Sequence, residues 1–330
     1  MNSSNRQPRV SVIICTRNRS ESLRITLECL ASADRRGLDA EVVVVNSAGN
    51  DDTEVVARSF GHRIPVRYLY QPILGVYGKS HALNLAIDAG GLGEIIAVLD
   101  DDISPRQDWF QRVIAICGRW PDVDIFTGDT YVIWPGENVP GWATKSSLRS
   151  WIFSAQHSGE SDSPMDDGRW FSGNHFWFRS RVLSLPTRFT DIWNCEAPFQ
   201  LDLAELGCRG VISKDAVAGH RIQPALLDRQ FVLDRARKVG ATHAWIRLVP
   251  SRTRVKQARL LSEHPVLGRL FCVGNSLRWR LLHAMSYLYP SDASSFEHRL
   301  ISLERMTTYL ELWRVANRLD QYSIWRRMPK

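Results

Sequence analysis

The sequence predicts an α/β fold with a mixed, mostly parallel sheet flanked by helices, followed by a helical C-terminal extension. Strand-like and helix-like segments alternate from Arg9 onward, which is typical of parallel strands joined by crossover helices. Beyond Pro224 the pattern becomes helical, with Arg and Lys interleaved among Leu, Trp and Val. A chain of 330 residues is long enough for two modest domains. We therefore expect a first domain over residues 1–224 and a basic helical region over residues 225–330.

The first predicted strand covers residues 10–15 and ends in the polar turn of residues 16–19. Ser20 is a suitable N-cap for the helix that follows. Three leucines then recur at helical spacing and predict its apolar face, namely Leu23, Leu27 and Leu30.

A second and a third strand are expected at residues 41–45 and 65–70. The polar turn of residues 46–53 separates the second strand from another helix. After the third strand, Gly78-Lys79-Ser80 precedes a helix whose apolar side chains include Leu83, Ala86 and Ile87.

Five apolar residues at 95–99 run directly into three consecutive aspartates at 100–102. A short apolar run with β-branched residues predicts a strand that is buried on both faces. Ser104-Pro105 predicts the N-cap and first-turn proline of the next helix. The acids would then lie at a strand's carboxyl end, where open α/β sheets bind ligands, and they suit Mg²⁺ or Mn²⁺. The alternative is that one aspartate caps the helix and the others are solvated.

The next helix should bury an apolar face, and two further strands should complete the first domain. The strand of residues 123–134 is interrupted at Gly128, and another strand covers residues 211–219. Residues 135–167 are rich in Gly, Ser, Pro and acids and predict a long loop. The expected apolar face of the helix consists of Phe110, Val113, Ile114 and Cys117.

Charge is distributed unevenly along the chain. Residues 221–330 hold 20 Lys/Arg and 8 Asp/Glu, whereas residues 1–220 hold 22 Lys/Arg and 27 Asp/Glu. The six cysteines are dispersed without a CxxC pair, which favours reduced thiols in a cytoplasmic protein. The N-terminus lacks the apolar core of a signal peptide, and no uninterrupted run of about 18 apolar residues occurs. We expect a protein that is neither exported by that route nor membrane-spanning.

Several motifs follow one another in a specific order. They are residues 16–19 after the first strand, the turn of residues 46–53, Gly78-Lys79-Ser80 with Asn84, Leu99-Asp100-Asp101-Asp102, Ser172-Gly173-Asn174 with Phe178-Arg179, and an acidic segment some 20 residues on. In this order, over roughly residues 8–224, the chain resembles an inverting nucleotide-sugar glycosyltransferase of family 2 with the Rossmann-like GT-A fold. The resemblance implies sugar transfer from a nucleotide-diphosphate donor to the hydroxyl of a saccharide or lipid-linked acceptor, in cell-surface polysaccharide, glycolipid or glycoconjugate biosynthesis.

The resemblance also implies which residues bind the donor. Asp100 and Asp102 match the outer acids of an Asp-x-Asp motif that binds the diphosphate through Mn²⁺ or Mg²⁺, a cation that would stabilise the departing nucleotide. Asp102 is the expected direct ligand, with Asp100 and His220 as further ligands. Arg17 could instead be a surface residue, and His220 a structural one. The residues expected to contact the nucleotide-sugar are Thr16, Arg17, Asn18, Asn46, Asp51, Lys79, Asp100, Asp101, Gly173 and Asn174.

Asn46 departs from the family pattern, in which an Asp commonly follows the second strand. An Asn keeps one acceptor and gains a donor, so contact with a base remains feasible while carboxylate pairing to an imide is lost. Asp51 matches the second acid of the same turn, although capping the helix after Thr53 explains it equally well.

Glu196 is the expected general base, which would take the proton of the acceptor hydroxyl. The family usually has a Glu-Asp pair here, and counting back from Gly207, whose spacing to His220 fits the pattern, aligns Cys195-Glu196 with it. Asp191 is an alternative base. Asp202 and Glu205 are fallback candidates that also fit the solvated face of a helix.

Trp170, Trp177 and Trp193 flank the expected acceptor side, where a ring could stack on a sugar, and core packing is the expected use of at least one. The basic helical segments 231–246 and 267–288 suit either an anionic membrane surface or packing as a subdomain. A peripheral position on the cytoplasmic face of the inner membrane is therefore an alternative to a free cytoplasmic one. No recognised nucleic-acid-binding motif accompanies the charge, so nucleic acid is not an expected partner.

Two other functions compete with the transferase. A sugar-nucleotide pyrophosphorylase should have a Gly-rich phosphate loop after its first strand, and residues 16–19 contain no glycine. A catalytically degenerate GT-A scaffold remains open because Asn46 and Cys195 stand where the family has acids.

Overall fold

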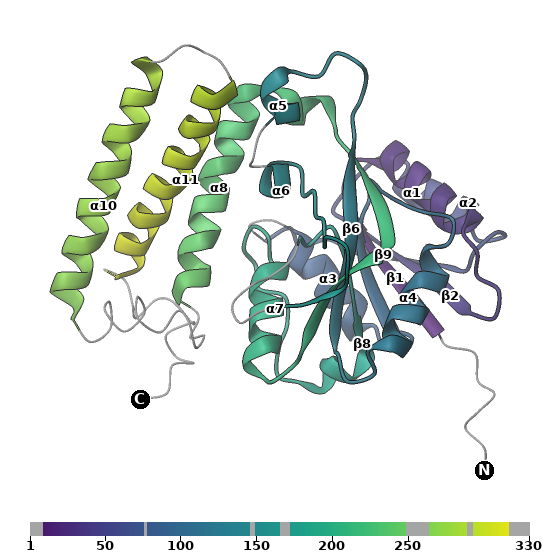
Figure 1. Ribbon diagram of the computed structural model, residues 1–330. Helices are drawn as coiled ribbons and strands as arrows, with labels where there is room; N and C mark the ends of the chain where they lie inside the picture. Colours follow the sequence, from purple (N-terminus) through teal and green to yellow (C-terminus); the bar gives the residue numbers. More distant parts are fainter. Residues whose placement is uncertain are drawn as a thin grey trace. The chain divides into compact units, whose positions relative to one another are not determined.

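The computed structural model describes residues 9–75, 78–145, 149–165, 172–248, 264–288 and 293–316. The chain divides into two compact units, the first formed by Met1–Ile133 with Ser154–Ile222 and the second by Trp134–Phe153 with Gln223–Lys330. The first unit contains the sheet and the second is helical (Figure 1). Residues 134–153, which the sequence assigned to the first domain, are thus grouped with the helical unit.

Within the described residues, nine strands form one mixed sheet. They are β1 (Arg9–Thr16), β2 (Asp39–Ser47), β3 (Val66–Gln71), β4 (Ile95–Asp100), β5 (Ile103–Pro105), β6 (Ile125–Ile133), β7 (Ser163–Pro164), β8 (His175–Arg179) and β9 (Gly210–Arg221). Their order is β3-β2-β1-β4-β8-β6-β9-β5, with β7 beside β9. The strands β1 to β4 are mutually parallel, β8 runs antiparallel to β4, and β9 runs parallel to β6. The predicted α/β class with a mixed, mostly parallel sheet is confirmed.

Helices cover both faces of this sheet (Figure 1). The helical segments of the first unit are α1 (Ser20–Ser32), α2 (Thr53–Ser59), α3 (Lys79–Asp88), α4 (Trp109–Arg119), η1 (Ser180–Ser184) and α7 (Glu196–Glu205). Buried side chains of α1, α2 and α4 share one core with the strands, and those of α3 and α7 share the other. The predicted leucines of α1 are fully buried. Of the predicted face of α4, Phe110, Val113 and Cys117 are buried and Ile114 is partly buried.

The burial of β4 explains why residues 95–99 are apolar at every position. Ile95, Ala97 and Leu99 belong to the core on one face, and Ile96 and Val98 belong to the core on the other. Side chains of a strand alternate between faces, so only a strand covered on both sides needs every position apolar.

The prediction that Ser104-Pro105 begins a helix is wrong. Residues 103–105 form β5, which pairs antiparallel with β9, and α4 begins only at Trp109. Proline is tolerated at a strand of this kind because β5 is the edge of the sheet and its outer side needs no donor. The predicted loop of residues 135–167 is also interrupted, by α5 (Gly141–Lys145), α6 (Arg149–Ile152) and β7.

The second unit contains three long helices after the 3-10 turn η2 (Pro224–Leu227) in its described part. They are α8 (Arg229–Leu248), α10 (Pro265–Met285), which continues into η3 (Ser286–Leu288), and α11 (Ala293–Ala316). Helix α11 packs against both α8 and α10 (Figure 1). Gly240 of α8 allows the close crossing with α11, since a Cβ there would lie 2.4 Å from the carbonyl oxygen of Glu304. Among the described helices, none combines the length and the apolar content needed to cross a bilayer.

Candidate functional site

Three parallel strands end at the same edge of the sheet. In register, Thr16 of β1 lies opposite Asn46 of β2, and Cys15 lies opposite Asp100 of β4. The loops that follow these strands therefore converge, as is usual for ligand sites in open α/β sheets. This edge holds the polar turns that the sequence singled out.

β5 brings a distant histidine to the aspartates. Ile103 pairs with His220 of β9, and the Arg221 N–H donates to the carbonyl of Asp102 at 2.9 Å. His220 Nε2 consequently lies 3.5 Å from Asp102 Oδ1. The strand pairing that sequence analysis missed is thus what joins these two expected metal ligands.

Arg19 bridges two of the three aspartates. Its Nη1 lies 2.8 Å from Asp101 Oδ1, and its Nη2 donates to Asp102 Oδ2 at 2.7 Å. Thr16 Oγ1 donates to Asp101 Oδ2 at 2.6 Å. Both carboxylates are almost completely buried, so a paired cation is needed to compensate for their lost hydration. Arg19 lies in the turn predicted after the first strand, and its local sequence indicates no role for it.

The pKa values of Asp101 and Asp102 are shifted in opposite directions. Burial raises the pKa of Asp101, Arg19 opposes the rise, and the neighbouring charge of Asp102 adds to it. Burial also acts to raise the pKa of Asp102, but His220 and Arg19 outweigh it and hold this pKa below its ordinary value. Asp102 is therefore the more acidic of the two, and its role as the direct metal ligand remains a prediction.

The backbone of the acidic turn is held from several sides. The Asp101 carbonyl accepts hydrogen bonds from Thr26 Oγ1 at 2.7 Å, Ser22 Oγ at 2.9 Å and Arg221 Nη2 at 2.9 Å. Arg221 Nη1 also bonds the Ile103 carbonyl at 3.1 Å. These bonds preorganise the turn, so that a ligand would meet carboxylates already in place. Nothing in the local sequence marks Arg221, and its position directly after His220 is the only clue.

The fit of this turn to a divalent cation rests on Asp102 and His220. In the described part of the chain, no three His, Cys, Asp or Glu side chains are grouped to hold a metal ion. Asp102 is buried, and its Oδ1 faces His220 Nε2 at 3.5 Å. Carboxylate and imidazole are acceptable donors for Mn²⁺, and a nucleotide-bound cation takes other ligands from phosphate and water. The pair therefore fits a cation that arrives with a nucleotide.

A second cluster surrounds Lys79 at the first turn of α3. Lys79 Nζ lies 2.5 Å from Asp100 Oδ1 and forms an ion pair with Glu196 Oε1. Burial acts to lower the pKa of Lys79, but Asp100 and Glu196 raise it well above its ordinary value, so the amine stays charged. Asp100 is thus directed toward Lys79, and its role as a metal ligand remains a prediction.

Cys195 and Gly173 complete the surroundings of Glu196, which is 2% exposed. Burial raises the pKa of the Cys195 thiol, so it stays protonated and its Sγ donates to Glu196 Oε2 at 3.6 Å. A Cβ on Gly173 would lie 2.4 Å from Glu196 Cδ, so only glycine leaves room for the carboxylate. The structure thereby brings together four expected site residues, which are Lys79, Asp100, Gly173 and Glu196.

Asn174 is a buried polar side chain beside this cluster. Its carbonyl accepts the Asp100 N–H at 3.0 Å, which ties the two segments together. Its side-chain Oδ1 and Nδ2 are both buried without a hydrogen-bond partner among the described residues. Buried polar groups in proteins are normally satisfied, so this amide is suited to a ligand group or a water.

The expected base-binding turn is organised by asparagines. Asn46 Oδ1 accepts the Gly49 N–H at 2.8 Å, and its Nδ2 donates to Tyr68 Oη at 3.1 Å. Asn18 Oδ1 accepts the Asn50 N–H at 2.8 Å, which joins the turn after β1 to the turn after β2. Nδ2 gives Asn46 a donor that an aspartate would lack, so the departure from the family pattern has a structural use.

Asp51 has the helix-capping contacts that the sequence left as an alternative. Its Oδ2 accepts the Ser20 N–H at 2.8 Å at the start of α1, and its Oδ1 accepts the Thr53 hydroxyl at 2.6 Å at the start of α2. Burial acts to raise the pKa of Asp51, but these bonds lower it below its ordinary value. Arg17 is exposed on the neighbouring turn after β1. A base contact by either residue remains a prediction.

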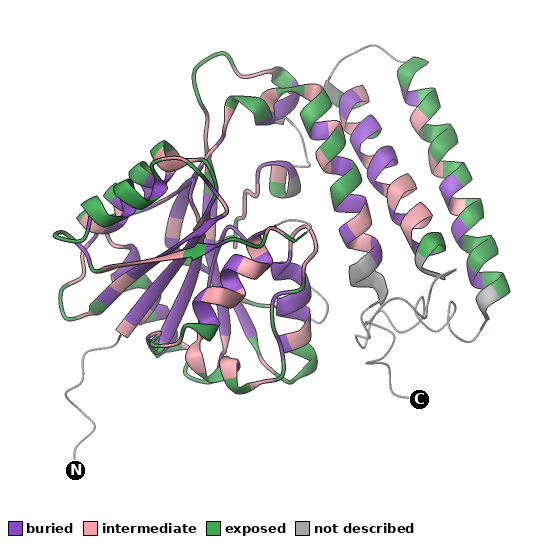
Figure 2. Cartoon of the chain, turned by 180° about the vertical axis from the view of Figure 1, so that it is seen from behind, coloured by how far each residue is buried: buried purple, intermediate pink, exposed green. Residues whose placement is uncertain are grey.

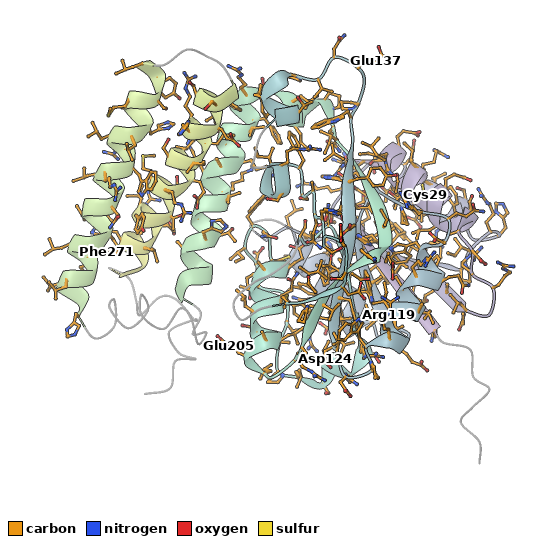
Figure 3. All side chains as sticks on the ribbon, in the orientation of Figure 1. Cys29, Arg119, Asp124, Glu137, Glu205 and Phe271 are labelled. Atoms are coloured by element: carbon orange, nitrogen blue, oxygen red, sulfur yellow. The ribbon has the colours of Figure 1, made fainter. Side chains whose placement is uncertain are left out.

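The alternative bases lie at different distances from this edge. Asp191 is close to it, since its Oδ1 accepts Ser80 Oγ at 3.2 Å and its Oδ2 lies 3.4 Å from His81 Nε2, both on α3. Asp202 accepts the Thr187 hydroxyl at 3.2 Å, and Glu205 is exposed at the end of α7 (Figure 3). Asp191 is therefore the more relevant rival to Glu196.

Two aromatic predictions can be placed. Trp177 is fully buried and stacks on Phe126, so it is the tryptophan used for core packing. Trp193 is half-buried, and Trp170 lies outside the described residues. His175 was not singled out by the sequence, and burial lowers its pKa to about 3. It accepts the Trp109 Nε1–H at 2.8 Å, so it is a neutral structural histidine.

The family comparison covers the acidic turn and Lys79 but ends before Glu196 and His220. A family model described as glycosyl transferase family 2 matches residues 11–183, slightly more than half of the chain. The chain is 33% identical over 132 residues to glycosyltransferase AglE of Haloferax volcanii, covering 39% of this chain and 41% of that protein. It is 31% identical over 107 residues to a chondroitin synthase of Escherichia coli, covering 32% and 15%. The chain thus spans less than half the length of either relative.

A solved structure resembles the fold over almost the whole chain. The mannosyltransferase PcManGT from Pyrobaculum calidifontis, in complex with GDP-Man and Mn²⁺, aligns with a TM-score of 0.55 at 19% identity. The alignment covers 96% of this chain and 89% of that protein. At this identity the likeness supports the fold, which is the expected GT-A arrangement.

Proposed function

The chain belongs to glycosyl transferase family 2, and we propose that it transfers a sugar from a nucleotide-diphosphate donor to an acceptor hydroxyl with inversion. One observation carries the proposal: Asp100 links the two clusters of the sheet edge. Its side chain contacts Lys79, which holds Glu196, and its neighbours in the chain are the acids that contact Arg19 and His220. The acids proposed to bind the donor and the proposed general base, Glu196, thus lie at the same edge of the sheet.

In this proposal the acidic turn holds the nucleotide diphosphate. Asp102 and His220 would hold Mn²⁺ or Mg²⁺, which neutralises charge that develops on the leaving nucleotide. Arg19 and the network around the Asp101 carbonyl keep the turn in position. Asn174, whose side-chain amide is buried and unsatisfied among the described residues, is suited to a hydroxyl of the donor sugar.

Glu196 would remove the proton of the acceptor hydroxyl as that oxygen bonds to the anomeric carbon and the bond to the diphosphate breaks. Inversion requires the base on the side of the sugar opposite the leaving group. Lys79 holds one oxygen of the carboxylate, and the Cys195 thiol contacts the other. We further propose a saccharide or lipid-linked acceptor in polysaccharide, glycolipid or glycoconjugate synthesis, supported by the relative named chondroitin synthase.

The test separates donor binding from transfer. Thermal shifts with UDP, GDP, dTDP and CMP, each with and without Mn²⁺, identify the nucleotide, because a ligand that binds only the folded protein raises its melting temperature. With that donor, Asp102→Asn should abolish the Mn²⁺-dependent shift. Glu196→Gln should retain the shift and lose transfer by about a hundredfold or more.

Asp191→Asn is the matched control for Glu196→Gln, because it removes the other carboxylate near α3. Loss of transfer in Asp191→Asn with activity retained in Glu196→Gln would assign the base to Asp191 and overturn our choice. The anomeric configuration of the product, followed by NMR, tests inversion directly. A retained configuration would contradict the displacement mechanism.

A further inference from the structure

Helix α10 packs one face against α11 and leaves an apolar face exposed. Gly268, Cys272 and Ser276 are buried, and the ring of Phe271 meets Tyr309 of α11 at 5.8 Å. The opposite side carries large apolar side chains that are exposed. Figure 2 colours residues along much of α10 as exposed. We call these residues the α10 apolar face: Val266, Leu267, Leu270, Val273, Leu277, Leu281 and Met285.

The spacing of this set follows one side of a helix. Val266, Leu270, Val273, Leu277 and Leu281 are separated by three or four positions, which aligns their side chains in one stripe. Leu270, Leu277 and Leu281 are each between 57% and 63% exposed. The stripe runs for about 20 residues, or about 30 Å of helix. A contiguous apolar surface of this length marks an interaction site.

Arginines lie along both borders of the stripe. On a helical projection, Arg269 and Arg280 fall on one side of it and Arg278 on the other, and all three are exposed. The Arg278 guanidinium lies over the ring of Trp279 at 5.8 Å. From residue 265 to residue 288 the sequence contains no Asp or Glu. The face is therefore apolar at its centre and purely cationic at its edges.

We propose that the α10 apolar face binds flat against an anionic lipid surface. Leucines would enter the boundary between headgroups and acyl chains, while the arginines extend their aliphatic stems and keep their charges among the headgroup phosphates. Each cation near such a surface adds attraction to anionic lipid. This inference does not rest on the proposed function, since it concerns a surface of the second unit.

A second copy of the chain is the less suitable occupant. A symmetric contact through this stripe would bring identical arginine borders together, and the stripe offers no acid to neutralise them. An anionic membrane supplies both the apolar layer and the complementary charge. The observations thus favour lipid over self-association.

Flotation of the full-length protein with lipid vesicles tests the proposal. Vesicles of phosphatidylcholine containing phosphatidylglycerol should bind the wild type, and vesicles of phosphatidylcholine alone should bind it more weakly. The double variant Leu277→Asp/Leu281→Asp should lower partitioning at least about tenfold, because it places charge in the apolar layer. Arg278→Glu/Arg280→Glu should lower binding to the anionic vesicles selectively.

Val55→Asp is the matched control, because Val55 is 68% exposed on α2 and belongs to the first unit. It should bind vesicles like the wild type. Circular dichroism and the nucleotide-induced thermal shift should be unchanged in all variants, which excludes misfolding. Flotation that is absent in the wild type, or equal in the Leu→Asp variant, overturns the proposal. A wild-type dimer in light scattering that Leu277→Asp/Leu281→Asp dissociates, without lipid binding, assigns the face to a second copy instead.

Discussion

The half-buried Lys79 at the start of α3 forms an ion pair with the buried carboxylate of Glu196 at the start of α7. The first turn of a helix favours negative charge and disfavours positive charge, so Glu196 is well placed and Lys79 is not. Contacts with Glu196 and with Asp100 compensate for the position of Lys79. The pair therefore ties the proposed base to the acidic turn and holds both in one arrangement.

Removing Lys79 should destabilise the folded protein and not merely slow sugar transfer. Lys79→Met leaves the buried Glu196 carboxylate without its cation, which we expect to lower the free energy of unfolding by about 3 kcal/mol. Urea unfolding measures this change, and adding Glu196→Gln should recover part of the loss because the orphaned charge is gone. Arg58→Met, which breaks an exposed pair with Glu54 on α2, should cost less than about 1 kcal/mol. Equal losses in the two single variants would show that the pair of Lys79 with Glu196 contributes no more than a surface pair.

Gly173 should matter for transfer through the space it leaves to Glu196. In Gly173→Ala the added Cβ would lie 2.4 Å from Glu196 Cδ, so the carboxylate must move. We expect transfer to fall at least about tenfold, since displacements of about 1 Å are costly in catalysis. The thermal shift with donor nucleotide should change little. Gly136→Ala is the control, because nothing lies near its added Cβ. Unchanged turnover in Gly173→Ala would argue against Glu196 as the base.

The strands and most helix faces of the first unit could be predicted because their signals are local. The run of residues 95–99 is apolar at every position, and the structure covers β4 on both faces. Leu23 and Leu27 recur at helical spacing, and both are buried. Such patterns reflect the burial of one segment, and they do not depend on which partner covers it.

The site was less predictable because its contacts join distant segments. Ser104-Pro105 has the local signature of a helix start, but pairing of β5 with β9 determines its conformation. Arg19 and Arg221 resemble ordinary surface residues in the sequence, yet they hold the acidic turn through contacts with Asp101 and its neighbours. Whether a polar side chain is solvated or buried depends on tertiary packing, and local sequence does not encode it.

A glycine in the second unit should be sensitive to a single methyl group. A Cβ on Gly240 would lie 2.4 Å from the Glu304 carbonyl and 2.8 Å from Thr307 Cβ, so Gly240→Ala would separate α8 from α11. We expect a loss of about 1–3 kcal/mol in the free energy of unfolding. Gly274→Ala is the matched control, because Gly274 is also helical and has no neighbour within 4 Å. It should stabilise by about 0.5–1 kcal/mol through helix propensity. Thermal or urea denaturation of the two variants gives the contrast, and a Gly240→Ala protein as stable as wild type would contradict the close crossing.

Low pH should lower the stability of the second unit, because it protonates Glu304. This buried carboxylate lies 2.7 Å from His243 Nδ1 and accepts the Thr308 hydroxyl at 3.0 Å. Burial acts to raise the pKa of Glu304, but His243, Arg305 and Thr308 hold it below its ordinary value of 4.5. A lowered pKa in the folded state means that the unfolded chain takes up the proton first as the pH falls. The stabilisation from this carboxylate is therefore complete above about pH 4.5 and is lost as the pH falls through the folded pKa.

The variant Glu304→Gln tests the direction of this pH dependence, because glutamine has nearly the same shape as glutamate and does not titrate. The wild type should be more stable than Glu304→Gln at neutral pH, and the difference should shrink below about pH 4.5. Urea unfolding at several pH values, read with a probe in the second unit, measures the difference. Glu311→Gln is the control, since Glu311 pairs only with Arg314 at the surface of α11 among the described contacts. A difference for Glu304→Gln that stays constant through the acid range would mean that this carboxylate does not carry the pH dependence.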